Sequence, residues 1–284
     1  QAVGFAGLAT RQMLSDGEVI SVAMGLDYMI HPDFRNGFAA SRLVNGWLKN
    51  VSADQREYAF GLCYPNTNSY KILTGKKLAW QPVCELTMMI RPIGKINKLP
   101  GKLARLPSWL LGPAFRAASL FSTLIAGVFA GRDTPGALEE ISHFDERFDA
   151  LWARAQIRTG SARTAAHLNW RYLRHPLYKY RSFAWVRDGK VLGYVIVTVR
   201  EVFDIPAVLI VDALGDPNEP NVLATLVKRV ANYTRDHQHA LIAAQVVGHS
   251  ALQKAFTKAG LLSVPKRLCP KSFALTFHTL GRGA

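Results

Sequence analysis

A short segment after Pro32 combines residue types that bind phosphates. It spans residues 35–42, between a hydrophobic stretch that ends at Ile30 and a run, residues 40–51, whose apolar residues recur at helical spacing. The start of a helix exposes unpaired N–H groups and about half a positive charge, which suits a pyrophosphate. Small residues let the backbone approach the phosphates and arginines add charge: Gly37, Ala39, Ala40, Arg35 and Arg42. The segment predicts a phosphate site; the alternative is an ordinary strand-to-helix turn.

The composition is that of a folded, strongly basic protein. Of 284 residues, 49% are hydrophobic and 19% are charged, which suffices for a sizeable core and excludes wholesale disorder. There are 35 lysines and arginines against 20 aspartates and glutamates, a net charge of +15. This charge predicts an anionic partner, which is a nucleotide, a nucleic acid or a membrane surface.

Cysteine content and hydrophobic patterning restrict the location. The three cysteines, Cys63, Cys84 and Cys269, are too few and too scattered for a disulfide framework or a Cys-rich zinc site, so we expect no metal and a reducing compartment. No stretch of about 20 apolar residues and no signal-peptide pattern is present. We therefore expect a cytoplasmic protein, with peripheral membrane contact if the connector described below binds lipid.

One pattern of elements occurs twice, about 185 residues apart. Each copy has two strands, a helix, a strand, a second helix and a closing strand. The strands and first helix are predicted over residues 3–7, 26–31, 40–51, 58–63 and 81–90, and again over 192–196, 209–213, 222–230, 240–246 and 271–277. Only the second copy has a preceding hairpin and a helix over residues 144–157. The first copy is therefore expected to lack its opening elements, in a chain that begins inside a longer gene product.

Three segments resemble the GNAT family of N-acetyltransferases. Residues 30–43 (IHPDFRNGFAASRL) resemble its acetyl-CoA-binding segment, a strand and a proline followed by Arg/Gln-x-x-Gly-x-Gly/Ala at a helix start. Residues 64–71 (YPNTNSYK), leading to Leu-Ala-Trp at 78–80, resemble the Pro-Asn…Gly-Trp/Phe segment of one branch of the family. Residues 168–180 (LNWRYLRHPLYKY) resemble the second half of tandem GNAT proteins. The resemblance covers nearly the whole chain except residues 95–135.

The resemblance implies an α/β (α+β) fold of two GNAT-like mixed β-sheet units flanked by helices and joined by a basic, partly helical connector. Residues 1–94 would form the acyl-CoA-binding unit, incomplete at its start. Residues 95–142 would form the connector. Residues 143–284 would form a degenerate unit with an acceptor or structural role.

The co-substrate implied is acetyl-CoA or another acyl-CoA. By resemblance, its binding residues are Met29, Ile30, Arg35, Asn36, Gly37, Phe38, Ala39, Ala40, Asn66 and Ser69. The sequence departs from the family at Phe38, which occupies a glycine position and is expected to narrow the phosphate cradle. The matching turn of the second copy, residues 215–221, holds two carboxylates and two prolines. Because carboxylates would repel a pyrophosphate and prolines lack N–H donors, that copy is predicted to bind no CoA.

Acetyl transfer needs a base for the ammonium proton and a donor for the leaving thiolate. Asp27 is the predicted base, because strand alternation places it with Met29 on one face and Tyr28 with Ile30 on the other. The alternative for Asp27 is a structural strand-end carboxylate. The family's usual donor tyrosine falls on Leu73, so Tyr70, one turn earlier, is the predicted substitute. The alternative for Tyr70 is a helix residue packed on the sheet.

Aromatic and basic residues at 170–172 form a candidate acceptor site. Trp170, Arg171 and Tyr172 offer aromatic faces and a guanidinium fork, which suit sugars or carboxylates. The alternative is an aromatic helix end that seals the two units together.

The connector is basic and partly apolar. No acidic residue occurs from 86 to 132, where seven basic residues stand, and an apolar helix is predicted over 114–130, after an interruption at Gly112-Pro113. One interpretation is peripheral membrane contact through residues 95–131, and the other is a linker helix packed across both units. Nucleic acid is the less favoured partner because no nucleic-acid-binding signature accompanies the charge.

These features favour an acyl-CoA-dependent N-acyltransferase that acetylates an amine of a small molecule, amino sugar or envelope precursor. The alternative is a catalytically silent GNAT-like scaffold that binds an anionic membrane surface or a polyanion.

Overall fold

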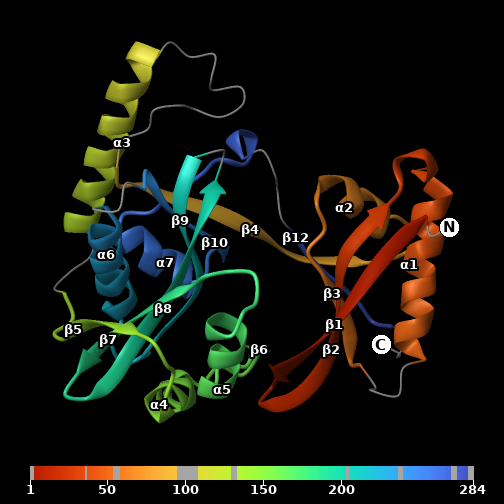
Figure 1. Cartoon of the computed structure of the whole chain (residues 1–284), viewed down its shortest axis with the longest axis horizontal. Coiled ribbons are helices and arrows are strands. Elements are labelled where there is room, and N and C mark those ends of the chain that lie inside the picture. The colour runs from red at the N-terminus through yellow and green to blue at the C-terminus, as the bar shows by residue number, and fades with distance from the viewer. Residues whose placement is uncertain are drawn as a thin grey trace. The chain divides into compact units, whose positions relative to one another are not determined.

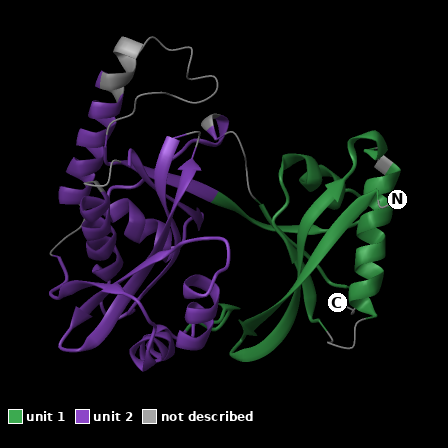
Figure 2. Cartoon of the chain, in the orientation of Figure 1, with its two compact units in different colours: residues 1–86, 157–162, 271–284 green, residues 87–156, 163–270 purple. Residues whose placement is uncertain are grey.

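The computed structural model describes residues 3–35, 37–53, 58–94, 108–128, 133–202, 205–235, 239–269 and 274–280. Its contacts divide the chain into two compact units (Figure 2). Unit 1 contains Gln1–Leu86, Ile157–Ala162 and Lys271–Ala284, and unit 2 contains Thr87–Gln156 and Arg163–Pro270. These bounds differ from the predicted ranges 1–94, 95–142 and 143–284 because two segments late in the chain pair with strands of unit 1.

Unit 1 begins with a long antiparallel hairpin, β1 (Gly4–Ser15) and β2 (Glu18–Ile30). Its turn is formed by Asp16 and Gly17, whose φ angles of 50° and 90° lie in the left-handed region typical of an Asp-Gly hairpin turn. The helix α1 (Gly37–Ser52) follows, then β3 (Phe60–Cys63), α2 (Thr67–Leu73) and the start of β4 (Gln81–Pro92). β3 pairs with β2 in parallel. Two short strands complete the sheet: β12 (Ala274–His278), which pairs with β3 and β4, and β6 (Gly160–Ser161), which pairs with β1.

The core of unit 1 lies between its sheet and α1. Val44, Trp47 and Val51 recur at helical spacing and are buried together with Trp80. The indole N–H of Trp47 donates to the carbonyl of Gly7 at 3.1 Å, which ties α1 to β1. The helical spacing that predicted α1 is therefore the spacing of its buried face.

Unit 2 has a mixed sheet with strand order β5-β7-β8-β9-β10-β4, and β11 pairs with the far end of β4 (Figure 1). Its strands are β5 (Ala137–Ile141), β7 (Arg181–Arg187), β8 (Lys190–Val202), β9 (Ile205–Gly215), β10 (Leu241–Val247) and β11 (Leu262–Ser263). Its helices are α3 (Ser108–Val128), α4 (Glu146–Ala155), α5 (Ala165–Leu168), α6 (Val222–Arg235) and α7 (Ala251–Lys258). On the face of α6 that predicted a helix, Leu226, Val227 and Val230 are fully buried, and Leu223 is partly buried.

The predicted order of strands and helices is present in both halves, and the mixed α/β class is confirmed. Two details are corrected. The strand predicted to close the second copy, β12, pairs with β3 and β4 in unit 1, while residues 87–92 of β4 belong to unit 2. The connector helix begins at Ser108 and contains Pro113 instead of starting after it. The tandem interpretation stays a prediction.

Among the described helices, none is long and apolar enough to cross a membrane.

Candidate active site

A cavity of about 1040 Å³ opens in unit 1 where β2 and β3 separate. The parallel pairing of these strands runs from Val22 and Phe60 to Gly25 and Cys63, where it ends. Beyond this point β2 continues to Ile30, whereas the chain leaves β3 toward α2. The cavity is lined by both diverging segments, by the beginnings of β1 and α1, and by α2.

A β-bulge shapes the β2 wall of the cavity. Phe5 pairs with Met29 and Gly7 pairs with Leu26, so Asp27 and Tyr28 stand opposite a single residue of β1. Asp27 has a φ of 49°, in the left-handed region. A bulge leaves its extra residue unpaired with the neighbouring strand, which frees backbone polar groups for a ligand.

The alternation predicted for this strand is present. Asp27 and Met29 are exposed, while Tyr28 and Ile30 are partly buried, and all four line the cavity. Asp27 therefore presents a solvated carboxylate to the cavity.

The turn from β2 to α1 carries Arg35 into the cavity lining. The Nε of Arg35 donates to the carbonyl of Ile30 at 3.0 Å, and the backbone N–H of Asp33 donates to Nδ1 of His31 at 3.4 Å. These bonds fix the turn that precedes α1. Ala40, in the first turn of α1, also lines the cavity, where the positive end of the helix favours anions.

None of the other predicted phosphate-binding residues of this segment lines the cavity among the described residues. Phe38 is 76% exposed and does not line the cavity, so the expected narrowing does not occur. Ala39 is also absent from the lining, Gly37 is the first residue of α1, and Asn36 lies outside the described residues.

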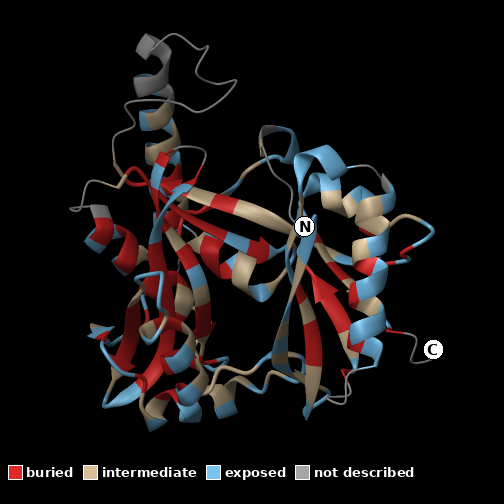
Figure 3. Cartoon of the chain, turned by 45° about the vertical axis from the view of Figure 1, so that its right-hand side comes forward, coloured by how far each residue is buried: buried red, intermediate tan, exposed pale blue. Residues whose placement is uncertain are grey.

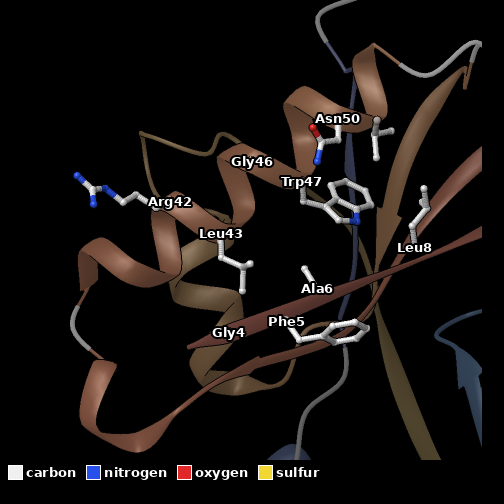
Figure 4. A pocket seen from close by; sticks show the side chains of 10 residues that line it. Gly4, Phe5, Ala6, Leu8, Arg42, Leu43, Gly46, Trp47 and Asn50 are labelled. Atoms are coloured by element: carbon white, nitrogen blue, oxygen red, sulfur yellow. The ribbon is translucent and has the colours of Figure 1, made fainter. Parts of the chain in front are cut away.

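Arg42 lines a separate hollow of about 470 Å³ between β1 and α1 (Figure 4). Figure 4 shows its side chain extending away from Trp47 and Ala6. Arg42 therefore contributes to a different surface from Arg35, contrary to the prediction that both add charge to one phosphate site.

The wall formed by α2 contains Asn66 and Ser69 but not Tyr70. Asn66 caps this helix, since its Oδ1 accepts the N–H groups of Asn68 and Ser69 at 3.1 and 3.0 Å. Leu73, at the family's usual tyrosine position, is buried and lines the cavity. Of the two predicted catalytic residues, the structure brings Asp27 to the cavity and leaves Tyr70 out of its lining.

Tyr28 is a cavity-lining residue to which the sequence interpretation assigned no catalytic role. A Cβ on Gly25 would lie 3.5 Å from the Tyr28 ring, and the Tyr28 hydroxyl is buried without a hydrogen-bond partner among the described residues. Burial raises the pKa of Tyr28 well above its ordinary value, and the neighbouring Cys63 acts in the same direction. Tyr28 therefore lines the cavity, but its protonated hydroxyl is itself buried and is not exposed to the cavity. Its signal in the sequence was its place next to Asp27 on the predicted strand.

Cys63 is expected to be alkylated about two hundredfold more slowly than an unhindered cysteine peptide at pH 8. Burial raises the pKa of its thiol to about 11, against the opposing effect of the backbone N–H of Tyr64. At pH 8 about 0.1% of such a thiol is the reactive thiolate, compared with about a quarter for a free cysteine. Peptide mass spectrometry after timed iodoacetamide treatment measures the rate, which should rise as the pH approaches 11. Equal rates for Cys63 and the peptide would contradict this burial.

The predicted acceptor residues lie in unit 2 and are absent from the cavity lining. They belong to a π-helical turn, Asn169–Leu173. Tyr172 is buried and its hydroxyl donates to Oδ2 of Asp212 at 3.1 Å, while the guanidinium of Arg171 lies 5.4 Å from the centre of the Tyr172 ring. Trp170 is exposed. Tyr172 thus anchors the turn, and of the two aromatic residues only Trp170 is accessible to a ligand.

The turn of unit 2 that follows β9 uses its polar groups internally. Asp216 is buried and its carboxylate lies 2.7 Å from Nε of Arg154 and 3.3 Å from Nζ of Lys190, and Glu219 pairs with Arg187. The N–H of Asp216 donates to Leu192, and the N–H of Glu219 to Asp216. The expectation that both carboxylates face a ligand is therefore wrong. The prediction that this turn binds no CoA remains, now because the N–H groups of Asp216, Asn218 and Glu219 are already hydrogen-bonded within the unit.

No protein-family model and no curated protein matches the sequence. Solved structures do resemble it. One is a GCN5-related N-acetyltransferase from Anabaena variabilis, with 15% identity, a TM-score of 0.54, and 97% of this chain and 60% of that chain covered. Another is a protein from Enterococcus faecalis described as a probable N-acyltransferase, with 12% identity, a TM-score of 0.56, and 98% and 59% coverage.

A third is N-myristoyltransferase from Saccharomyces cerevisiae with bound myristoyl-CoA, with 11% identity, a TM-score of 0.58, and 98% and 67% coverage. The chain spans about 60% of the length of the first two structures. At these identities the likeness establishes the fold: a mixed α/β sheet flanked by helices, as in the GNAT enzymes.

Proposed function

We propose that this chain, which has the fold of GNAT N-acyltransferases, transfers an acyl group from an acyl-CoA to an amine. The observation that carries the proposal is the cavity at the separation of β2 and β3, with Arg35 and the first turn of α1 in its lining. Its volume suits an elongated ligand of nucleotide size. We take the acyl group to be acetyl, and the acceptor to be the amine of a small molecule, an amino sugar or an envelope precursor.

The charged end of the co-substrate is assigned to the turn before α1. Arg35 keeps its remaining guanidinium N–H groups for phosphate oxygens while its Nε holds the carbonyl of Ile30. The macrodipole of α1 adds a positive potential at the same place. Asn66 and Ser69 border the cavity from α2.

The chemistry is assigned to the bulged part of β2. The amine attacks the thioester carbon, a C–N bond forms, and the C–S bond breaks. Of the two protons that the ammonium loses, one goes to Asp27 and the other ends on the sulfur of the released thiol. Backbone N–H groups of the bulge polarise the thioester carbonyl. The Tyr28 hydroxyl, which burial keeps protonated, replaces the predicted Tyr70 as donor to the departing sulfur, and this requires the ring to shift so that its buried oxygen reaches the cavity.

Isothermal titration with CoA and with acetyl-, octanoyl- and myristoyl-CoA tests the binding step. We expect saturable heat at one site, with acetyl-CoA bound at least as tightly as the longer chains. Acetylation of a panel of amines, followed by thiol release, tests the chemistry. The absence of heat with every acyl-CoA would overturn the proposal.

Arg35→Ala is expected to raise the Kd for acetyl-CoA about tenfold, which corresponds to about 1.4 kcal/mol. The substitution removes a charge-assisted contact to phosphate and the bond that fixes the turn. Arg35→Lys, which retains the charge, should recover part of the affinity. Arg158→Ala is the matched control, because Arg158 belongs to unit 1 and pairs with Asp16, and neither residue lines the cavity. Equal Kd values for the two alanine variants would exclude a phosphate contact by Arg35.

The second candidate function is a catalytically silent scaffold that binds an anionic surface. It is favoured by Leu73, which puts an apolar side chain at the family's donor position. This candidate predicts no acyl transfer to any amine and vesicle binding that is unaffected by Arg35→Ala.

A further inference from the structure

We propose that the helix α3 docks on the surface of a bilayer that contains anionic lipids. This inference rests on α3 and the residues that flank it in sequence, and it is independent of acyl transfer. Exposed apolar surface, basic charge and a fixed attachment to unit 2 each support it.

On the face of α3 that packs against the rest of unit 2, the fully buried residues are small, and Phe115 packs there partly buried. Ser122 and Ala126 are 0% and 3% exposed. The Ser122 hydroxyl donates to the carbonyl of Gly260 at 2.5 Å, next to the end of α7. A Cβ on Gly260 would lie 3.2 Å from the Cβ of Ala126 and even closer to the backbone of Ser122. This close contact holds the helix in one orientation on unit 2.

The opposite, exposed face carries four large apolar residues among smaller and polar ones. Leu120, Phe121, Leu124 and Val128 are 72%, 55%, 62% and 65% exposed. Residues 120, 124 and 128 are four apart, so they align along one side of the helix, and 121 stands beside them. Figure 3 shows exposed surface along the part of α3 whose burial is described. A helix normally buries its large residues and exposes its small and polar ones. A row of large apolar residues left exposed on a helix marks a surface for an apolar partner.

The charge of the flanking sequence identifies that partner as a lipid bilayer. Between Glu85 and Asp133 there are seven basic residues and no acidic ones: Arg91, Lys95, Lys98, Lys102, Arg105, Arg116 and Arg132. Arg91 is buried and donates to the carbonyl of Ala259, so it is used inside the fold. Arg116 is an exposed residue of α3 itself. Lysines and arginines near an anionic bilayer are attracted to its surface.

Other arrangements fit these observations less well. Over its described residues, α3 is not long and apolar enough to cross a membrane. A nucleic acid would use the charge but leave the apolar row in water. An interfacial helix uses both, with apolar side chains among the acyl chains and cations at the headgroups.

Vesicle flotation of the full chain tests the proposal. We expect binding to vesicles of about 30% phosphatidylglycerol in phosphatidylcholine, at least tenfold weaker binding to phosphatidylcholine alone, and weakening at high salt. Leu120→Glu combined with Leu124→Glu should reduce binding to the anionic vesicles at least tenfold. Val19→Glu combined with Leu177→Glu changes the charge equally at exposed apolar residues elsewhere and should bind like the unmodified protein.

Circular dichroism and melting temperature verify that both double variants are folded, which their exposed positions favour. The proposal would be overturned by equal vesicle binding of the two double variants. It would also be overturned by an absence of vesicle binding with retained heparin or RNA binding, which would assign the charge to a nucleic acid. Titration with acetyl-CoA should be the same for all three proteins, so failure here and failure of the proposed function are distinguishable.

Discussion

Asp27→Asn is expected to lower kcat for acetyl transfer about 10²- to 10⁴-fold, the usual contribution of a positioned general base. The Michaelis constant for acetyl-CoA should change less than about twofold, because the carboxylate acts on the amine. Asparagine also adopts the left-handed backbone conformation that residue 27 has at a φ of 49°. The substitution therefore removes the proton acceptor and keeps the bulge. Steady-state kinetics with a fixed amine measure both constants.

Two comparisons separate a base from a structural carboxylate. Asp33→Asn makes the same charge change in an exposed residue that does not line the cavity, and it should retain most of the activity. The defect of Asp27→Asn should shrink as the pH rises above the pKa of the amine, because a neutral amine needs no base to remove its ammonium proton. A loss of kcat that is independent of pH, or that Asp33→Asn shares, would show that Asp27 is not the general base.

Arg154→Met is expected to destabilise unit 2 by about 3–5 kcal/mol at pH 7, because it leaves a buried charge without its main partner. The Asp216 side chain is 0% exposed, and Arg154 approaches its carboxylate at 2.7 Å while also donating to the carbonyl of Val191 at 2.7 Å. Lys190, which lies 3.3 Å from the carboxylate and is half exposed, would compensate little of the lost stabilisation of Asp216. Urea unfolding followed by hydrogen exchange in unit 2 measures the loss. Arg158→Met, in an exposed pair with Asp16, should cost less than about 1 kcal/mol.

The pH dependence of this pair has a definite sign. Burial alone would raise the pKa of Asp216, but hydrogen bonds from Arg154, the Asn218 amide and Lys190 outweigh it and lower the pKa. A carboxyl group with a lowered folded-state pKa stabilises the fold above its unfolded pKa of about 3.9, and this stabilisation is lost as the pH falls through the folded value. The difference between Arg154→Met and the unmodified protein should therefore be full at pH 7 and shrink below about pH 4. A difference that stays constant down to pH 3 would contradict it.

Local sequence patterns predicted most elements of the fold, because helical spacing and apolar runs report burial directly. The Asp16-Gly17 hairpin is the exception. Strands were predicted there only over residues 3–7 and 26–31, because β1 alternates between exposed and partly buried residues and has no long apolar run. β2 does contain an apolar stretch, residues 19–26, interrupted by Ser21. The strands that pair with β12 could not be predicted either, because the burial pattern of five residues does not specify a pairing partner.

The site was predictable where residues are neighbours in sequence. Asp27, Arg35 and Ala40 line one cavity as expected because a single strand-turn-helix segment carries them. Tyr28 and Cys63 come together only through the parallel pairing of β2 and β3, which the sequence did not specify. Asp216 similarly pairs with Arg154, which lies 62 residues away along the chain. Because this pairing could not be predicted, Asp216 was expected to repel a ligand, whereas the structure buries it in an ion pair.

The position of β12 has a consequence for how the protein is made. β3 and the first half of β4 belong to the early part of the chain, yet the strand that pairs with both comes from residues 274–278. During synthesis, the hydrogen-bonding edges of β3 and β4 stay unpaired until residues 274–278 have been translated. Unit 1 can therefore complete its sheet only after the residues of unit 2 have been made. A chain truncated before Ala274 would therefore leave the edges of β3 and β4 without their partner strand. Such a product is a natural substrate for chaperones and proteases.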